Sequence, residues 1–307
     1  ASTVSSRGVY KFPVEDKKSA KYEDHQCSSY DVEACSWSNI PDEDFALADD
    51  NHWTIGQFVW TGFDYLGEPS PYDTDAWPNH SSMFGIIDLA SLPKDRYYLY
   101  RSVWNKDAET LHILPHWTWP GREGEVTPVF VYTNYPTAEL FINGKSYGKQ
   151  SKNNSSLKNR YRLMWMDAVY EPGEVKVIAY NKDGKAVAEK VVRTAGKPHH
   201  IELVSNRNEL TADGKDLAYV TVKVVDKDGN LCPTDNRQIN FSAKGTGKYR
   251  AAANGDPTNL EQFHLPKMHT FNGMLTAIIQ AGETAGEIVF TAKANGVKAG
   301  NIRIQTK

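Results

Sequence analysis

The sequence predicts a mixed fold, with an α/β part at residues 1–104 followed by two all-β parts at 105–195 and 196–307. Two observations carry this prediction. Helix-type and strand-type segments alternate in the first part, whereas the rest consists of short alternating strands separated by turn residues. The hydrophobic share of 40% and the charged share of 24% are typical of a soluble globular protein.

Composition excludes several classes of function. A net charge of -3 gives no electrostatic reason to expect nucleic acid or an anionic membrane as a partner. No apolar run reaches the roughly 18 residues that a membrane-spanning helix needs. The only cysteines, Cys27, Cys35 and Cys232, form neither a disulfide framework nor a metal-ligand pattern, and we expect no cofactor or metal. The N-terminus lacks the apolar core of a signal peptide.

The first part is expected to hold a strand between two helices. Helices are predicted from Pro41, where acidic residues follow the proline, and after Pro93, where aromatic residues recur at helical spacing. Residues 54–66 (TIGQFVWTGFDYL) are rich in aromatic and β-branched residues, which predicts a buried strand. One strand and two helices cannot bury their own apolar faces, so we expect the rest of the sheet to precede Ala1.

The two all-β parts are predicted to be sandwiches of the immunoglobulin type. Asn-Gly at 143–144 and Asp-Gly at 183–184 are hairpin-turn signatures, because these residues accept a positive φ. Gly196 and Pro198 mark the expected linker. Residues 226–230 (DKDGN) share part of a calcium-loop pattern but lack its distal glutamate, so a hairpin turn is favoured.

The candidate site lies in and after the predicted strand. Alternation would place Phe58, Trp60, Gly62 and Asp64 on one strand face, and Glu68 opens the turn-rich loop that follows. A tryptophan beside carboxylates offers a sugar both a stacking surface and hydroxyl acceptors. The alternative, a packed Trp60 with solvated acids, has equal weight from the pattern alone. No pair of acids stands out as the two carboxylates, about 5–5.5 Å apart, of a retaining glycosidase.

Several segments resemble glycoside hydrolase family 2 of the β-galactosidase type. Residues 56–69 (GQFVWTGFDYLGEP) resemble its eighth barrel strand, and residues 84–104 resemble the segment that closes the barrel. Residues 138–150 resemble the sandwich domain after the barrel, and 217–233 together with 254–264 resemble a terminal Ig-like module of the invasin/adhesin type. The resemblance implies the C-terminal remnant of a (β/α)8 TIM barrel followed by two Ig-like β-sandwich domains.

The resemblance also implies a function. The parent protein would be a bacterial, retaining exo-glycosidase that hydrolyses terminal β-galactosides and is periplasmic or secreted. Trp60 matches the tryptophan that lines the family's sugar subsite, and Asp64 and Glu68 match recurrent acids, so we assign all three to substrate binding. Phe84 stands where many β-galactosidases have an asparagine.

The catalytic machinery is expected elsewhere in the parent. The acid/base and the nucleophile would precede Ala1, so we expect this chain to be inactive alone and to contact the upstream barrel and N-terminal domains. Three alternatives remain open: β-glucuronidase specificity, β-mannosidase specificity, and a non-catalytic carbohydrate-binding or adhesin-like protein.

Overall fold

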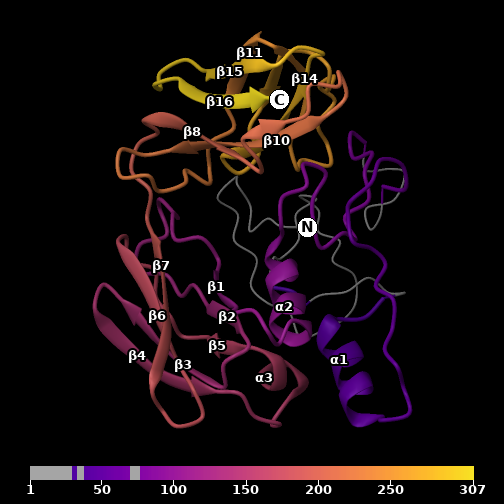
Figure 1. Cartoon of the computed structure of the whole chain (residues 1–307). Helices are drawn as coiled ribbons and strands as arrows, with labels where there is room; N and C mark the ends of the chain where they lie inside the picture. The colour runs from indigo at the N-terminus through magenta and orange to yellow at the C-terminus, as the bar shows by residue number, and fades with distance from the viewer. Residues whose placement is uncertain (1–29, 33–37, 70–76) are drawn as a thin grey trace. The chain divides into compact units, whose positions relative to one another are not determined.

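The structure, a computed structural model, describes residues 30–32, 38–69 and 77–307 and is mostly β-sheet (Figure 1). The predictions for Cys27 and Cys35 fall outside these ranges. The chain divides into two compact units. The first holds the described residues before 70 together with 81–87 and 93–194, and the second holds 77–80, 88–92 and 195–307. The first two expected parts therefore share one unit, and the three-part division stays a prediction.

Both expected helices of the first part are present. They are α1 (Pro41–Asp50), which begins with Pro41 and three acidic residues, and α2 (Asp95–Trp104), which follows Pro93. A short third helix, α3 (Leu157–Tyr161), begins where the Ser156 side chain accepts a hydrogen bond from the Asn159 backbone N–H. Proline favours a helix start because its missing N–H would have no partner there in any case. Acidic side chains favour a helix start because they face the positive end of the helix dipole.

Two antiparallel sheets form the β-structure of the first unit. The smaller has the order β1-β2-β5 and the larger the order β4-β3-β6-β7. The strands of the smaller sheet are β1 (Leu111–Leu114), β2 (Val129–Thr133) and β5 (Leu163–Trp165). The strands of the larger sheet are β3 (Thr137–Ile142), β4 (Lys145–Ser151), β6 (Glu174–Tyr180) and β7 (Ala186–Arg193). Asn143 and Gly144, with φ of 49° and 81°, form the predicted hairpin turn between β3 and β4.

Strand β2 lies at the centre of this unit and is buried at every position. Its side chains join one apolar core with residues of both sheets and of both long helices. On one face Phe130 packs edge-on against Tyr30, with ring centroids 4.6 Å apart. Because β2 is covered on both faces, its sequence (VFVYT) lacks the alternation of a half-exposed strand.

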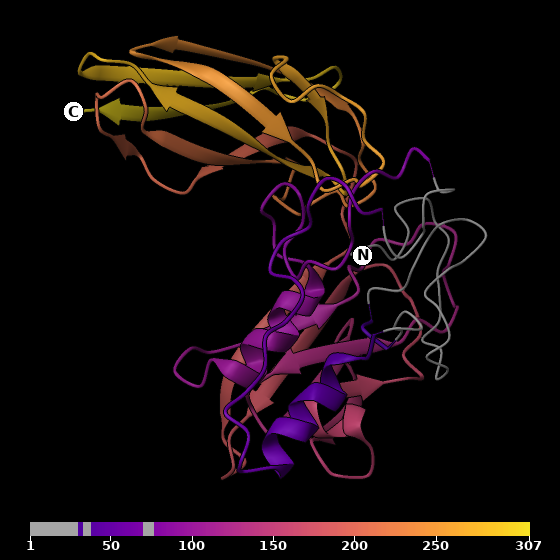
Figure 2. The ribbon, with the colours of Figure 1, turned by 90° about the vertical axis from the view of Figure 1, so that its right-hand side faces the viewer.

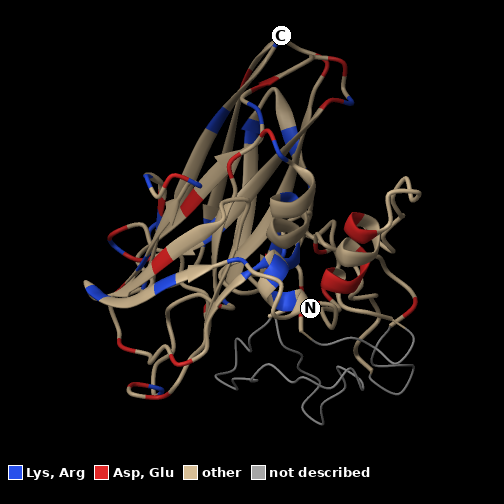
Figure 3. Ribbon diagram, turned by 90° about the horizontal axis from the view of Figure 1, so that it is seen from below, with Lys and Arg blue, Asp and Glu red and all other residues tan. Residues whose placement is uncertain are grey.

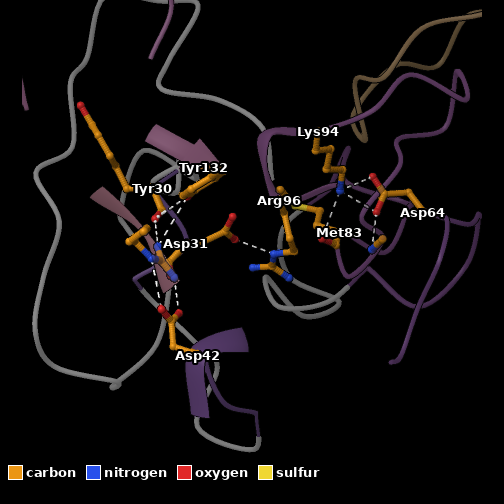
Figure 4. Close-up of polar contacts among 10 residues, drawn as sticks. Tyr30, Asp31, Asp42, Asp64, Met83, Lys94, Arg96 and Tyr132 are labelled. Carbon is orange, nitrogen blue, oxygen red and sulfur yellow. Dashed lines mark hydrogen bonds and ion pairs between the residues drawn. The ribbon is translucent and has the colours of Figure 1, made fainter. Parts of the chain in front are cut away.

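A buried ion pair fastens α1 to the segment that enters β5. The guanidinium of Arg162 pairs with the carboxylate of Asp42, and both side chains are fully buried. The same guanidinium donates to the carbonyl oxygen of Tyr30 at 2.8 Å (Figure 4). Two residues earlier, the more exposed Arg160 pairs with Asp50 at 2.8 Å. These bonds use the acidic residues that gather on α1 (Figure 3).

We predict that Arg162→Ala lowers the free energy of unfolding by about 3–5 kcal/mol, because Asp42 would be left buried without its partner. Arg160→Ala is the control and should cost at most about 1 kcal/mol, since that pair is exposed. Urea unfolding followed by tryptophan fluorescence measures both changes. Equal losses for the two variants would contradict a special role for the buried pair.

The second unit is a sandwich of two sheets (Figure 2). One sheet has the order β12-β14-β10-β8 and the other β13-β11-β15-β16-β9. The first contains β8 (His200–Ser205), β10 (Leu217–Val225), β12 (Gly247–Ala253) and β14 (Met274–Ala281). The second contains β9 (Glu209–Leu210), β11 (Gln238–Gly245), β13 (Lys267–His269), β15 (Gly286–Lys293) and β16 (Gly300–Thr306). Both sheets contribute to a separate apolar core, so this unit has its own packed interior.

Residues 226–230 form the predicted hairpin turn. The backbone N–H of Asp226 donates to the carbonyl of Asn230 at 2.9 Å, and Gly229 has a φ of 84°. Burial alone would raise the pKa of Asp226, but hydrogen bonds from the Asn230 side chain and from the backbone N–H groups of Gly196, Asn230 and Asp228 lower it to about 2. The carboxylate thus serves the turn and fastens Gly196 to it.

Because the pKa of Asp226 is lowered in the folded chain, the stabilisation that its carboxylate provides depends on pH. An ionised Asp226 stabilises the fold above the unfolded-state pKa of about 3.9, and this stabilisation is lost as the pH falls toward about 2. We expect Asp226→Asn to destabilise the chain at pH 7 by about 1–3 kcal/mol, because buried N–H groups lose their acceptor. Urea unfolding at several pH values should show wild type and variant converging between about pH 4 and pH 2. A difference that stays constant over that interval would contradict the assignment.

The predicted buried strand at residues 54–66 is wrong. This segment has no regular secondary structure and forms only two isolated bridges, from Phe63 to Ile87 and from Leu66 to Ser81. Phe58 is fully exposed and Trp60 is 72% exposed. A strand exists only where a neighbouring strand satisfies its N–H and C=O groups, and no continuous neighbour lies among the described residues. The barrel remnant expected from this segment stays a prediction.

Candidate functional site

Trp60, Tyr65 and Glu68 form a connected cluster on an irregular stretch of chain. The indole Nε1 of Trp60 donates a hydrogen bond to the Tyr65 hydroxyl at 3.2 Å. That hydroxyl in turn donates its own proton to the carboxylate of Glu68. The rings of Trp60 and Tyr65 meet edge to face, with centroids 6.0 Å apart and an interplanar angle of 81°. The cluster therefore joins an aromatic surface to a carboxylate through one phenol.

The electrostatics of the cluster keep Tyr65 protonated. Its hydrogen bond to the Glu68 carboxylate raises the pKa of the phenol, and loss of hydration raises it further. Ionisation would place a second negative charge beside the first, which is unfavourable. The phenol thus acts as a neutral link that donates to Glu68 and accepts from Trp60.

Beneath this cluster, Asp64 is part of a buried ion pair. Its carboxylate lies 2.7 Å from the ammonium of Lys94, and both side chains are almost completely buried (Figure 4). Asp64 also accepts from the backbone N–H of Gly85 at 2.8 Å, and Lys94 donates to the carbonyl of Met83 at 3.3 Å. These bonds hold together three stretches of chain: the one that carries the cluster, residues 83–87, and the entry to α2.

Backbone contacts reinforce this anchor at Gly85. The N–H of Asp64 donates to the carbonyl of Ile87 at 2.9 Å, so the two segments run side by side. A Cβ atom on Gly85 would lie 2.2 Å from the backbone nitrogen of Asp64 and 2.4 Å from the carbonyl carbon of Phe63. Only glycine fits this close approach. Phe84, beside it, is half-buried.

The three predicted site residues thus lie in two environments. Trp60 and Glu68 belong to the exposed cluster, whereas Asp64 is 9% exposed and its oxygens are bound by Lys94 and Gly85. The expected shared face of Phe58, Trp60, Gly62 and Asp64 is not formed, because strand alternation does not apply to an irregular segment.

Two participants, Tyr65 and Lys94, were missed by the sequence reasoning. Tyr65 lies between the two predicted acids, and that position was a usable signal. Lys94 is 30 residues from Asp64, and nothing in its surroundings indicates the contact.

The part of the chain that the structure describes holds no group of three or more His, Cys, Asp or Glu side chains that could bind a metal ion. In the same residues, no helix combines the length and apolar character needed to cross a bilayer.

Models of known protein families match parts of both units. Residues 201–303 match the model of the glycoside hydrolase family 2 C-terminal domain 5, and residues 124–188 match a model described as Domain of unknown function (DUF4982). A β-galactosidase of Bacteroides ovatus is 42% identical over 315 aligned residues, which cover 100% of this chain and 36% of that protein. This chain belongs to glycoside hydrolase family 2.

Two further proteins match this chain over part of their own length. A putative β-glucuronidase of Formosa agariphila is 35% identical over 68% of this chain and 20% of its own length. A crystal structure of a β-glycosidase from Bacteroides vulgatus superposes with a TM-score of 0.84 at 31% identity, covering 97% of this chain and 37% of that one. This family 2 chain spans about a third or less of the length of the curated relatives it matches first.

We predict that Gly85→Ala destabilises the chain by about 1–3 kcal/mol, because the new methyl group would push the backbone at Asp64 away from its partners. Gly62→Ala is the matched control, since a Cβ there meets nothing within 4 Å. The control should change stability by no more than about 1 kcal/mol. Thermal unfolding followed by circular dichroism separates the two variants, and equal melting temperatures would refute the close approach.

Proposed function

We propose that the chain is part of a retaining exo-β-glycosidase, and that Trp60 is a sugar-stacking surface in its substrate site. The observation that carries the proposal is the exposed indole of Trp60, which Tyr65 links to the carboxylate of Glu68 in a member of glycoside hydrolase family 2. The C–H faces of a pyranose are apolar and pack on an aromatic ring, whereas its hydroxyls need acceptors. The cluster offers both.

The proposed substrate is a terminal β-galactoside of an oligo- or polysaccharide. The relative that matches the whole chain at 42% identity is a β-galactosidase. A putative β-glucuronidase matches a smaller part of the chain at 35% identity, so β-glucuronide specificity is the second candidate. Because sugar specificity depends on a few side chains at the site, family membership alone does not decide between them.

We further propose that residues before 105 complete a catalytic barrel with parts of the protein that this chain does not contain. Exposed apolar side chains along the irregular segment, among them Ile55, Phe58 and Phe63, support a covering partner. The two catalytic carboxylates of a retaining enzyme would lie in that complementary part, and the protein would be periplasmic or secreted. The isolated chain should then hydrolyse no aryl β-galactoside.

The role of Trp60 can be tested in the full-length protein with an aryl β-galactoside. Trp60→Ala should lower kcat/KM by about tenfold to a hundredfold, since a stacked aromatic ring contributes on the order of 1–3 kcal/mol. Its melting temperature should change little, because the ring is 72% exposed in this chain and a ring that lines an open sugar site is not packed in a core.

Trp165→Ala is the structural control. That ring is 1% exposed in the core, and its removal should cost about 3–5 kcal/mol of stability. A Trp60 variant that is destabilised but keeps its catalytic efficiency per folded molecule would make Trp60 a packing residue. A full-length protein that cleaves aryl β-glucuronides faster than β-galactosides would favour the second candidate.

A further inference from the structure

The Trp60–Tyr65–Glu68 cluster carries one uncompensated negative charge. The carboxylate of Asp64 is neutralised by Lys94, 2.7 Å away. Glu68, by contrast, forms no ion pair with any residue in the described ranges 30–32, 38–69 and 77–307. Among the residues that the structure describes, the charge beside the exposed indole of Trp60 is therefore that of Glu68.

Hydrogen bonds hold the Glu68 carboxylate in place and leave one of its two oxygens able to accept a hydrogen bond from a ligand. The Tyr65 proton is committed to one oxygen of Glu68, and the Trp60 N–H is committed to Tyr65. Glu68 Oε2 is thus two hydrogen bonds from the indole nitrogen, at most about 6 Å away, which is comparable to the width of a pyranose. The second oxygen, Oε1, accepts no hydrogen bond within the described part of the chain.

A sugar stacked on Trp60 would meet Oε1 as an acceptor. A hydroxyl group can donate to it, forming a charge-assisted hydrogen bond that is stronger than one between neutral groups. A carboxylate on the sugar has no proton to donate at neutral pH and brings a like charge. At a separation of about 5 Å in bulk water this repulsion corresponds to about a fourfold loss of affinity, and to more where water is excluded.

We propose that Glu68, held in place by Tyr65, is a specificity-determining residue that favours neutral terminal sugars over uronic acids. Tyr65 is its positioning residue. This inference rests on the proposed function and deepens it, because it names the chemical property by which the site would separate a β-galactoside from a β-glucuronide.

The test compares galactose with galacturonate. The two ligands differ only at C6, which carries a hydroxymethyl group in galactose and a carboxylate in galacturonate. Their dissociation constants for the full-length protein are measured by isothermal titration calorimetry at low and high salt. The wild type should bind galactose at least fourfold more tightly at low salt, with a smaller preference at high salt because ions screen exposed charges. Glu68→Gln keeps the shape and removes the charge, and it should lower the preference by about three- to tenfold.

Two variants complete the test. Tyr65→Phe removes the phenol that fixes Glu68 and should lower the preference to a value between those of wild type and Glu68→Gln. Glu189→Gln removes an exposed charge from β7 and should leave the preference unchanged.

An equal preference in wild type and Glu68→Gln, a wild type that prefers galacturonate, or a lack of binding of either sugar would overturn the proposal. Because calorimetry needs no turnover, these outcomes are distinct from a failure of the proposed function. Absence of β-galactosidase activity would refute that function, whereas an active enzyme with an unchanged ligand ratio would refute only the role of Glu68.

Discussion

The ion pair between Asp64 and Lys94 is the constraint on which the arrangement of the candidate site depends. Two buried charges lose much of their hydration, so each needs its partner and further hydrogen bonds. Gly85 and Met83 supply these bonds from the backbone. As a result, a segment without regular secondary structure is held in one conformation, and the cluster that contains Trp60 projects from a fixed base.

A second buried ion pair, between Arg162 and Asp42, lies in the first unit, and both of its side chains are fully buried. In both places a basic residue comes from a later stretch of chain and an acidic residue from an earlier one. Apolar packing around β2 stabilises this unit but does not by itself fix how its elements are oriented. The buried ion pairs join particular side chains and so fix which elements lie together. Together they hold the two long helices and both sheets of the first unit against one another.

Local sequence signals predicted much of the fold. Pro41 with its acids, and Asn143 with its glycine, act within a few residues, so a helix start and a hairpin turn could be predicted from the sequence alone. The segment at 54–66 could not, because its apolar residues are typical of a buried strand, whereas strand formation depends on a neighbour distant in sequence. For the candidate site, Trp60 and Glu68 were singled out by residue type, and their role in substrate binding stays a prediction. The inward orientation of Asp64 was missed, since Lys94 lies 30 positions further along.

The order of strands in the second unit has a consequence for how the chain can be altered. Strand β16 lies between β15 and the short β9, so the last strand of the sequence is an interior strand of its sheet. Removing β16 would expose the full edge of β15, and unpaired edges invite association between molecules. Insertions are better tolerated in exposed turns between strands than in this strand. Evolution and engineering alike should therefore vary the loops of this module while keeping its final strand intact.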